Sequence, residues 1–347
     1  MLKYVIIFLI LGGKSDLKNS NPMVSIIIPV YNAQNTIRDC ILSCINQNYP
    51  NYEVIVVDDG STDQSRNILK EFSGHITYVY NENKGVSAAR NIGINESHGE
   101  YIVFCDSDDM VTEKYISILA NARDDNTLII GGLTKNIDLL GFANSEFTNM
   151  DIYFKQSTSK FTCLLEGMLI QGPCCKLFYK KIIHENSLVF DENMCFGEDF
   201  KFVLSYLTYV NRLKFINEYI YYYRFNPNSI TAKVDEQRVL SFIELSRFFT
   251  KFEFDENLQN SDVAKFRIHQ IVSDYFNMLL LASNSDMKSL IKYRKMMRNN
   301  KVINSAILLR DKSRCSLIIN FILMFDSVLI WKIVYLIRKV IRGRCNR

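Results

Sequence analysis

Residues 101–109 read Tyr101-Ile102-Val103-Phe104-Cys105-Asp106-Ser107-Asp108-Asp109, a short apolar run that ends in three carboxylates within four residues. A run of this length, rich in β-branched and aromatic residues, predicts a buried β-strand. Acidic side chains crowded on one turn repel one another unless a cation lies between them, and oxygen ligands suit hard divalent cations. The alternative is a solvated acidic turn that caps the following helix, and this turn alone does not decide between the two.

Further strands and helices alternate ahead of this stretch. Apolar runs predict strands at Val24–Pro29, Glu53–Val57 and Ile76–Tyr80. Helical spacing of apolar residues predicts helices at Thr36–Asn46, from a cap at Ser61 or Thr62 through Phe72, and at about Ser87–Asn95. Strands that alternate with helices in this way predict crossover connections and an α/β fold with a mostly parallel sheet.

Each predicted strand is followed by a polar or turn-forming group, and ligands of such sheets bind outside the carboxyl ends of the strands. The groups are Pro29-Val30-Tyr31, Asp58-Asp59, Lys84-Gly85 and Asp106-Ser107-Asp108. Because all of them converge on one edge, we interpret the acidic turn as functional. A dinucleotide-binding sheet would need Gly-x-Gly-x-x-Gly after the first strand, which has no glycine there. The sequence therefore favours a metal ion, rather than a glycine-rich turn, as the group that binds a diphosphate.

Composition narrows the class of protein. The chain has 347 residues, is 48% hydrophobic and 22% charged, and carries a net charge of +4. It is long enough for two or three structural units, it is not a disordered protein, and its charge gives no reason to expect nucleic acid as a partner. Nine scattered cysteines without a CxxC pair, and only four histidines, predict a reduced intracellular protein with core thiols rather than a zinc site.

Four blocks of sequence resemble family 2 glycosyltransferases, in the order and spacing of that family. They are Ser25–Asn32, Val56–Asp63, Asn83–Gly93 and Phe104–Asp109. The resemblance implies an inverting enzyme with the GT-A fold, Rossmann-like in its N-terminal half, that uses a nucleotide-activated sugar. Lys176-Leu177-Phe178, Gly197-Glu198-Asp199 and Tyr222-Tyr223-Arg224 resemble later features of the bacterial capsular and surface-polysaccharide members. The resemblance fades after about residue 230.

The resemblance also implies roles for the acidic turn. Asp108 is expected to bind a divalent metal, Mn²⁺ or Mg²⁺, directly, and Asp106 to hold the ribose or share the metal. A metal on the diphosphate would stabilise the charge that develops on the leaving nucleotide. The role of Asp109 stays open: it could contact the metal or the substrate, or it could cap a helix at Glu113–Ala122.

Nucleotide contacts are implied around the other strand ends. Pro29 and Tyr31 are expected to flank the base, and Asp58 and Asp59 to accept a hydrogen bond from the uracil imide. For either aspartate, the alternative is a turn residue bonded to its own backbone. Lys84 or Arg90 is expected at the diphosphate, with a structural ion pair as the equal alternative for Arg90.

Transfer with inversion needs a base that takes the proton of the acceptor hydroxyl. The family pattern implies Asp199 in this role, with Glu198 as the alternative. Acids at a helix start are also favoured by the helix dipole alone. Direct displacement needs no covalent intermediate, which agrees with a sequence that offers no nucleophile constellation. Lys176 is a weaker candidate for contact with the acceptor or the diphosphate.

The C-terminal third is predicted to be helical, with helices at Val239–Phe252, Ala264–Leu281 and Met287–Met297. Leu317–Val340 is nearly all apolar but contains Asp326, which is costly in a membrane span. We therefore expect a helix that lies on the membrane, with a basic tail facing anionic cytoplasmic lipid, and keep a buried core helix as the alternative. The apolar N-terminal stretch is too short to span a bilayer and is predicted to be a weak anchor or extension.

These observations divide the chain into an N-terminal extension and linker (1–22), a GT-A domain (23–230), a helical region (231–315) and a membrane-associating helix with a basic tail (316–347). The domain splits into a nucleotide-sugar half (about 23–130) and an acceptor half (about 131–230). The expected activity is transfer from a UDP-sugar to a glycan or polyprenyl-linked saccharide at the cytoplasmic face of the inner membrane, by a peripheral or C-terminally anchored enzyme. The alternatives are a non-catalytic nucleotide-sugar-binding subunit and a sugar nucleotidyltransferase; the latter would want a glycine- and arginine-rich phosphate loop, which is absent.

Overall fold

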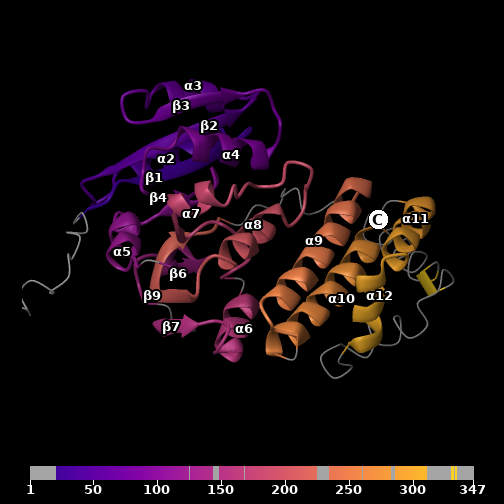
Figure 1. Cartoon of the computed structure of the whole chain (residues 1–347). Coiled ribbons are helices and arrows are strands. Elements are labelled where there is room, and N and C mark those ends of the chain that lie inside the picture. The colour runs from indigo at the N-terminus through magenta and orange to yellow at the C-terminus, as the bar shows by residue number, and fades with distance from the viewer. Residues whose placement is uncertain are drawn as a thin grey trace, which may run out of the picture.

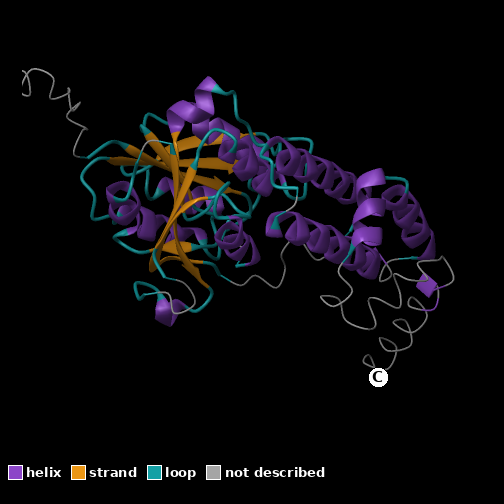
Figure 2. Ribbon diagram, turned by 60° about the horizontal axis from the view of Figure 1, so that its bottom comes forward, coloured by secondary structure: helices purple, strands orange, loops and turns teal. Residues whose placement is uncertain are grey.

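The computed structural model describes residues 21–124, 126–143, 148–167, 169–224, 234–259, 261–282, 286–310, 330, 331 and 333. A central sheet with helices on both sides continues into a separate group of helices formed by the C-terminal part of the chain (Figures 1 and 2). The sheet has nine strands in the order β3-β2-β1-β4-β8-β6-β9-β5, with β7 paired to β9.

The N-terminal half of the sheet is parallel, as the sequence predicts. Its strands are β1 (Val24–Val30), β2 (Tyr52–Asp59), β3 (Thr77–Asn81) and β4 (Tyr101–Phe104). The connecting helices are α2 (Ile37–Ile45), α3 (Ser65–Lys70) and α4 (Val86–Glu96). All of β1 is buried, which agrees with its near-continuous apolar sequence and with helices on both faces of a parallel sheet.

Two local predictions differ from the structure. The first strand does not end at Pro29 but continues to Val30, because β4 pairs with β1 only from Val24 to Ile27 and Pro29 lies beyond that ladder, where no N–H is needed. The cap predicted at Ser61 or Thr62 is wrong. Helix α3 starts at Ser65, whose N–H donates to Asp63 Oδ1 over 2.9 Å.

The second half of the sheet is mixed. Strand β8 (Lys176–Tyr179) is antiparallel to both β4 and β6 (Thr127–Thr134), whereas β6 and β9 (Arg212–Tyr222) are parallel. The short strands β5 (Met110–Val111) and β7 (Met150–Tyr153) add to β9 in antiparallel pairing. The helical elements of this half are α5 (Tyr115–Asn121), η1 (Ile137–Leu139), α6 (Thr158–Glu166), α7 (Lys180–Glu185) and α8 (Glu198–Leu207).

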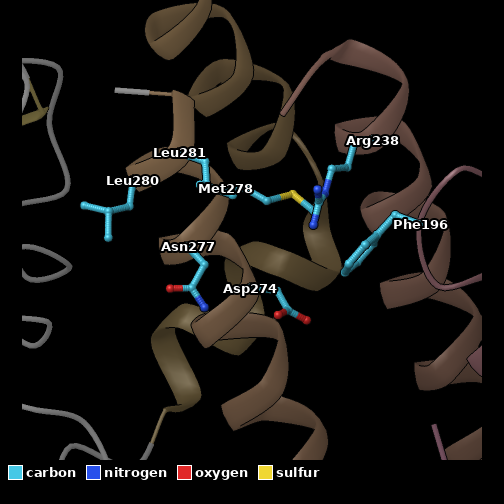
Figure 3. Close-up of a pocket in the computed structure, with 7 residues that line it drawn as sticks. All are labelled: Phe196, Arg238, Asp274, Asn277, Met278, Leu280 and Leu281. Carbon is cyan, nitrogen blue, oxygen red and sulfur yellow. The ribbon is translucent and has the colours of Figure 1, made fainter. Parts of the chain in front are cut away.

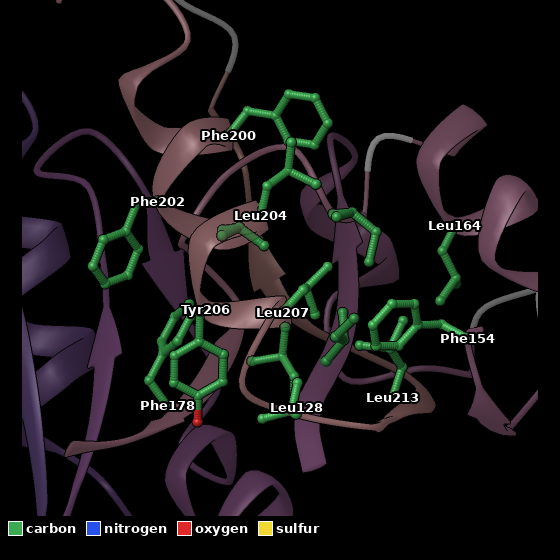
Figure 4. Packing of buried hydrophobic residues seen from close by; sticks show 14 of the residues in the cluster. Leu128, Phe154, Leu164, Phe178, Phe200, Phe202, Leu204, Tyr206, Leu207 and Leu213 are labelled. Carbon is green, nitrogen blue, oxygen red and sulfur yellow. The ribbon is translucent and has the colours of Figure 1, made fainter. Parts of the chain in front are cut away.

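The core beneath α8 fixes the position of that helix. Six of its side chains are buried, and Figure 4 shows Leu204 and Leu207 directed into the cluster of apolar side chains, with Tyr206 beside Phe178 of β8. The Phe202 ring stacks on Phe190 at 4.0 Å between centroids and meets the edge of Phe104 at 6.3 Å. Burying a side chain of this size contributes about 1.5–3 kcal/mol. The first turn of α8 is therefore held firmly against the end of β4.

The predicted helices of the C-terminal third are confirmed as α9 (Glu236–Asp255), α10 (Asp262–Ala282) and α11 (Met287–Arg298), and α12 (Lys301–Leu309) follows. Trp331 is buried against this group, with its ring 5.6 Å from that of Phe276. Among the helices that the structure describes, none combines the length and apolar character that a membrane crossing requires. The helix predicted at 316–347 lies outside the described residues apart from 330, 331 and 333, as does the extension at residues 1–20.

Candidate functional site

The acidic turn follows β4 and is hydrogen-bonded to β1 and β9. The N–H of Cys105 donates to Ile27 O in β1 over 3.0 Å, and the N–H of Asp106 donates to the Tyr221 hydroxyl in β9 over 3.1 Å. The side chain of Asp106 is 32% exposed and Asp108 is half-buried. The turn therefore presents two carboxylates at the carboxyl edge of the parallel strands, as the sequence predicts.

Asp109 has a different role from its neighbours. Its carboxylate is 1% exposed and accepts hydrogen bonds from the Tyr221 hydroxyl (2.5 Å) and the backbone N–H of Arg224 (2.9 Å). The predicted helix cap is wrong, because α5 begins at Tyr115 after Lys114 and has no side-chain cap. Burial, together with the nearby charge of Asp106, raises the pKa of Asp109 to about 8. Asp109 thus ties the end of β9 to the turn.

Arg90 connects the turn to α8 from the middle of α4. Its guanidinium is 6% exposed and lies 2.9 Å from Asp106 Oδ1 and 3.6 Å from Glu198 Oε1. The Phe190 ring lies beneath it, 5.3 Å from Cζ to the centroid. Burial lowers the pKa of Arg90, but the carboxylates of Asp106 and Glu198 outweigh burial and keep it above its ordinary value. Arg90 thus forms the structural ion pair that was the alternative to a diphosphate contact in the sequence analysis.

Glu198 and Asp199 form the first turn of α8. The residue before them, Gly197, has φ +73°, a left-handed backbone conformation that favours glycine. Burial and the charge of Asp199 raise the pKa of Glu198 to about 7. Burial also raises the pKa of Asp199, although Arg90 and the N–H of Phe200, 2.7 Å from Oδ1, oppose the shift.

Residues Gly172–Cys175 lie beside Asp199. The buried ammonium of Lys176 donates to the carbonyls of Gly172 (2.5 Å) and Cys174 (3.3 Å), and burial lowers its pKa to about 8. A Cβ on Gly172 would lie 3.8 Å from Asp199 Oδ2. Lys176 therefore supports the wall of the site.

Asp58 is fully buried in β2. It accepts hydrogen bonds from the Ser61 N–H (2.8 Å), the Tyr78 hydroxyl (2.7 Å) and Arg66 Nε (3.2 Å). Burial alone would raise its pKa, and these hydrogen bonds bring it below the ordinary value. Its carboxylate thus fixes the turn after β2, and a direct contact with a nucleotide stays a prediction.

Asp59 organises the next strand end in the same way. It accepts hydrogen bonds from Asn81 Nδ2 (2.7 Å) and from the backbone N–H groups of Lys84 and Gly85 (both 2.8 Å). The Lys84 side chain is exposed on the loop that Asp59 holds. Tyr31, two residues after the buried Pro29, is 48% exposed. Lys84 and Tyr31 are therefore available to a ligand at this edge.

Sequence reasoning missed the partners of these acids. Tyr221, Arg66 and Phe190 take part through contacts with Asp109, Asp58 and Arg90. Tyr221 directly precedes Tyr222-Tyr223-Arg224, which was a usable signal. Nothing in the sequence around Arg66 or Phe190 distinguishes either residue from an ordinary surface or core position.

The residues of the turn fit a hard divalent cation. Carboxylate oxygens of Asp106 and Asp108 are the ligand type that Mg²⁺ and Mn²⁺ prefer, and the partial exposure of both leaves room for phosphate and water oxygens. Arg90 engages Oδ1 of Asp106, and metal binding by either carboxylate stays a prediction.

A separate pocket of about 320 Å³ lies between α9, α10 and the loop before α8. Its lining residues are Phe196, Arg238, Asp274, Asn277, Met278, Leu280 and Leu281. In Figure 3 the side chains of Arg238, Met278, Asp274 and Phe196 converge, whereas Leu280 points away. Burial raises the pKa of Asp274 to about 6. No residue expected to be functional from the sequence lines this pocket.

Comparisons with known proteins agree with the motifs. Residues 25–186 match the family model described as glycosyl transferase family 2. The uncharacterized glycosyltransferase EpsJ of Bacillus subtilis is 32% identical over 217 residues, which are 60% of this chain and 63% of EpsJ. A poly(ribitol-phosphate) beta-glucosyltransferase of Bacillus spizizenii is 29% identical over 265 residues, 73% of this chain and 39% of that protein. The chain thus spans less than two thirds of either relative.

Solved structures share the fold. The crystal structure of S. aureus TarS 1–349 in complex with UDP-GlcNAc has a TM-score of 0.65 at 17% identity, covering 92% of both chains. The mannosyltransferase PcManGT from Pyrobaculum calidifontis, in complex with GDP-Man and Mn²⁺, has a TM-score of 0.52 at 14% identity, covering 98% of this chain and 94% of that one. At such identities the likeness concerns the fold, and it confirms the predicted GT-A architecture with a helical C-terminal region.

Proposed function

Because the chain belongs to glycosyltransferase family 2 through its domain at residues 25–186, we propose that it transfers a sugar, with inversion, from a UDP-sugar to a glycan or polyprenyl-linked saccharide. The observation that carries the proposal is the position of Arg90. Its buried guanidinium joins Asp106 of the donor turn to Glu198 at the start of α8. Groups suited to hold a donor and groups suited to take a proton therefore lie around one cation.

The donor end of the site consists of the acidic turn and the loops that Asp58 and Asp59 hold. Asp108, with Asp106, would bind a divalent cation, Mn²⁺ or Mg²⁺, which when bound would neutralise charge on the leaving diphosphate. The Lys84 side chain would meet the same diphosphate, and Tyr31 would lie against the base. The UDP-GlcNAc complex of TarS and the Mn²⁺ complex of PcManGT support this assignment by their fold.

The acceptor end consists of Glu198 and Asp199. Asp199 would take the proton of the attacking hydroxyl, and Glu198 is the second candidate. A base works best when its pKa is close to the working pH; burial raises the pKa of Glu198 to about 7 and that of Asp199 above its ordinary value. Gly172 keeps the space beside Asp199 Oδ2 free of a side chain. An acceptor hydroxyl could occupy that space without displacing protein atoms.

The test of this proposal is a panel of nucleotide sugars with Mn²⁺ or Mg²⁺ and an extract of lipid-linked acceptors, scored for nucleotide release and product mass. We expect transfer from one UDP-sugar. Donor binding without transfer to any acceptor would instead favour a non-catalytic nucleotide-sugar-binding subunit. No transfer with any donor, together with unchanged donor binding by Asp108→Ala, would overturn the metal-assisted mechanism.

We also propose that the enzyme works at the cytoplasmic face of the inner membrane, held there by residues 316–347. The support is the sequence, in which an apolar stretch precedes basic residues without an acid after Trp331. Deleting the residues after Ser316 should move the protein from the membrane fraction to the soluble fraction. An unchanged distribution would count against this location.

A further inference from the structure

Three thiols converge beneath the acidic turn, outside the site described above. Cys40 and Cys44 lie one helical turn apart on α2, and Cys105 follows the last residue of β4. All three side chains are 0% exposed, and their sulfur atoms lie within 4.8 Å of one another. The Sγ atoms of Cys40 and Cys105 are 3.8 Å apart. Thiolate sulfur is the preferred ligand of soft and borderline cations such as zinc.

A fourth candidate ligand atom adjoins two of the three sulfurs. The carbonyl oxygen of Asp106 lies 3.4 Å from Cys40 Sγ and 3.7 Å from Cys105 Sγ. This oxygen belongs to the backbone of the turn, so it is distinct from the carboxylate that pairs with Arg90. Three sulfurs and one oxygen together make up the donor number of a tetrahedral zinc site.

The spacing of these atoms agrees with such a tetrahedron. With Zn–S of about 2.3 Å and Zn–O of about 2.1 Å, neighbouring sulfurs would be about 3.8 Å apart and sulfur and oxygen about 3.6 Å apart. The distances of 3.8, 3.4 and 3.7 Å match the three edges that join Cys40 Sγ, Cys105 Sγ and the carbonyl oxygen, and Cys44 Sγ lies within 4.8 Å of both other sulfurs. We propose that Cys40, Cys44, Cys105 and the Asp106 carbonyl oxygen form a structural zinc site. The proposal does not depend on the proposed glycosyltransferase activity.

Binding follows a balanced exchange of protons for metal. One Zn²⁺ replaces the protons of three thiols, three H⁺ leave, and the resulting tris-thiolate centre carries one negative charge, with the carbonyl as a neutral ligand. The centre would join α2 to the backbone of Asp106. Zinc would therefore stiffen the turn from behind, while the cation proposed at Asp108 would lie on its open side.

The prediction of core thiols rather than a zinc site rested on motifs that do not detect a cluster of this kind. Two ligands come from a spacing of four residues on a helix, which places both on one face, and the third comes from a strand end 65 residues after Cys40. A search for CxxC pairs, or for histidines close to a cysteine pair, does not detect this arrangement. The signal becomes visible only when the sheet brings β4 beside α2.

The test uses the full-length chain, purified under reducing conditions and freed of metal, and titrates it with Cd²⁺ as a spectroscopic substitute for zinc. Binding at the thiols should give a thiolate-to-cadmium charge-transfer band that saturates at one Cd²⁺ per chain and is abolished by competing Zn²⁺. Cadmium bound to carboxylates at Asp108 gives no such band, so the two sites are distinguishable.

Variants assign the band to these cysteines. Cys40→Ala and Cys44→Ala should each abolish it, whereas Cys163→Ser, which changes an exposed cysteine on α6, should leave it unchanged. Folding of each variant is checked by circular dichroism. If the cluster variants do not fold, alkylation of the wild-type chain in urea, mapped by mass spectrometry, decides: zinc should slow labelling of Cys40, Cys44 and Cys105 at least several-fold.

Two results would overturn the proposal. One is a folded wild-type chain that shows no thiolate band at excess Cd²⁺ and no protection of the three cysteines by zinc, which would make the cluster ordinary core packing. The other is a band that survives in both Cys40→Ala and Cys44→Ala, which would place the bound metal at other thiols.

Discussion

Arg90 Nη2 lies 2.9 Å from the Oδ1 atom of Asp106, and this ion pair is almost entirely shielded from water on the arginine side. The same guanidinium reaches Glu198 at 3.6 Å. The acidic turn and the start of α8, which are far apart in sequence, therefore share the positive charge of Arg90. The protonation of the acids at the start of α8 depends on an arginine that also orients the acidic turn.

The first prediction concerns that arginine. Arg90→Ala should destabilise the fold by about 3 kcal/mol, because removing one partner of a buried pair leaves the other charge uncompensated. Arg90→Lys keeps a charge but loses the planar fork that reaches two carboxylates, so we expect stability close to wild type and strongly reduced transfer. Urea unfolding and initial rates measure the two effects.

The matched control for Arg90 is Arg38→Ala. Arg38 forms an ion pair with Glu71 in which both side chains are about half exposed, so the unfolding midpoint should hardly move. Equal unfolding curves for Arg90→Ala and wild type would show that the buried pair contributes nothing to stability.

The second prediction concerns the base. A general base must be ionised, so kcat/KM should fall as the pH drops through the pKa of Asp199, which burial raises above its ordinary value. Asp199→Asn should lower kcat by about 10²–10⁴. Glu198→Gln should retain most of kcat. The reverse order of the two variants in a pH–rate series would make Glu198 the base.

The third prediction concerns the metal. Chelation should stop transfer, and Mn²⁺ or Mg²⁺ should restore it. Asp108→Asn should raise the metal concentration needed for half-maximal activity by at least about tenfold. Mutating a residue that only hydrogen-bonds to a metal ligand already has an effect of that size, and Asp108 is the proposed ligand itself. Ser107→Ala, on the same turn, is the control and should behave as wild type. Activity that persists in chelator would exclude the metal role of Asp108.

The sequence predicts the N-terminal half of the sheet and its helices, because these elements depend on the pattern of neighbouring residues along the chain. The strands and helices from Val24 to Phe104 follow from apolar periodicity, and the predicted site residues lie at the ends of these strands. The mixed pairing of β8, β6 and β9 does not follow, because antiparallel β8 joins strands that are distant in sequence. Periodicity carries no information about such pairing.

The same limit applies to the site. The sequence identifies the acidic residues themselves, because three carboxylates on one turn are unusual. It does not reveal that Asp109 bonds to Tyr221, 112 residues away, or that Asp59 holds the Lys84 loop from the adjacent strand. Whether an aspartate contacts a ligand or holds the backbone depends on these distant partners.

The last prediction concerns Asp109, whose burial raises its pKa to about 8. Between the pKa of an unfolded aspartate, about 3.9, and pH 8, the folded chain binds a proton at Asp109 that the unfolded chain has released. The free energy of unfolding should therefore fall as the pH rises through this window, by at most about 1.4 kcal/mol per pH unit from this residue.

Asp109→Asn removes that titration, so its free energy of unfolding should decline less than that of wild type between pH 5.5 and 8 in urea titrations. Tyr221→Phe is the matched control: it removes a hydrogen bond that lowers the pKa of Asp109 but leaves the carboxyl buried, so the decline should persist. Parallel pH dependence of Asp109→Asn and wild type would mean that Asp109 is ionised throughout, held as a carboxylate by Tyr221 and the N–H of Arg224.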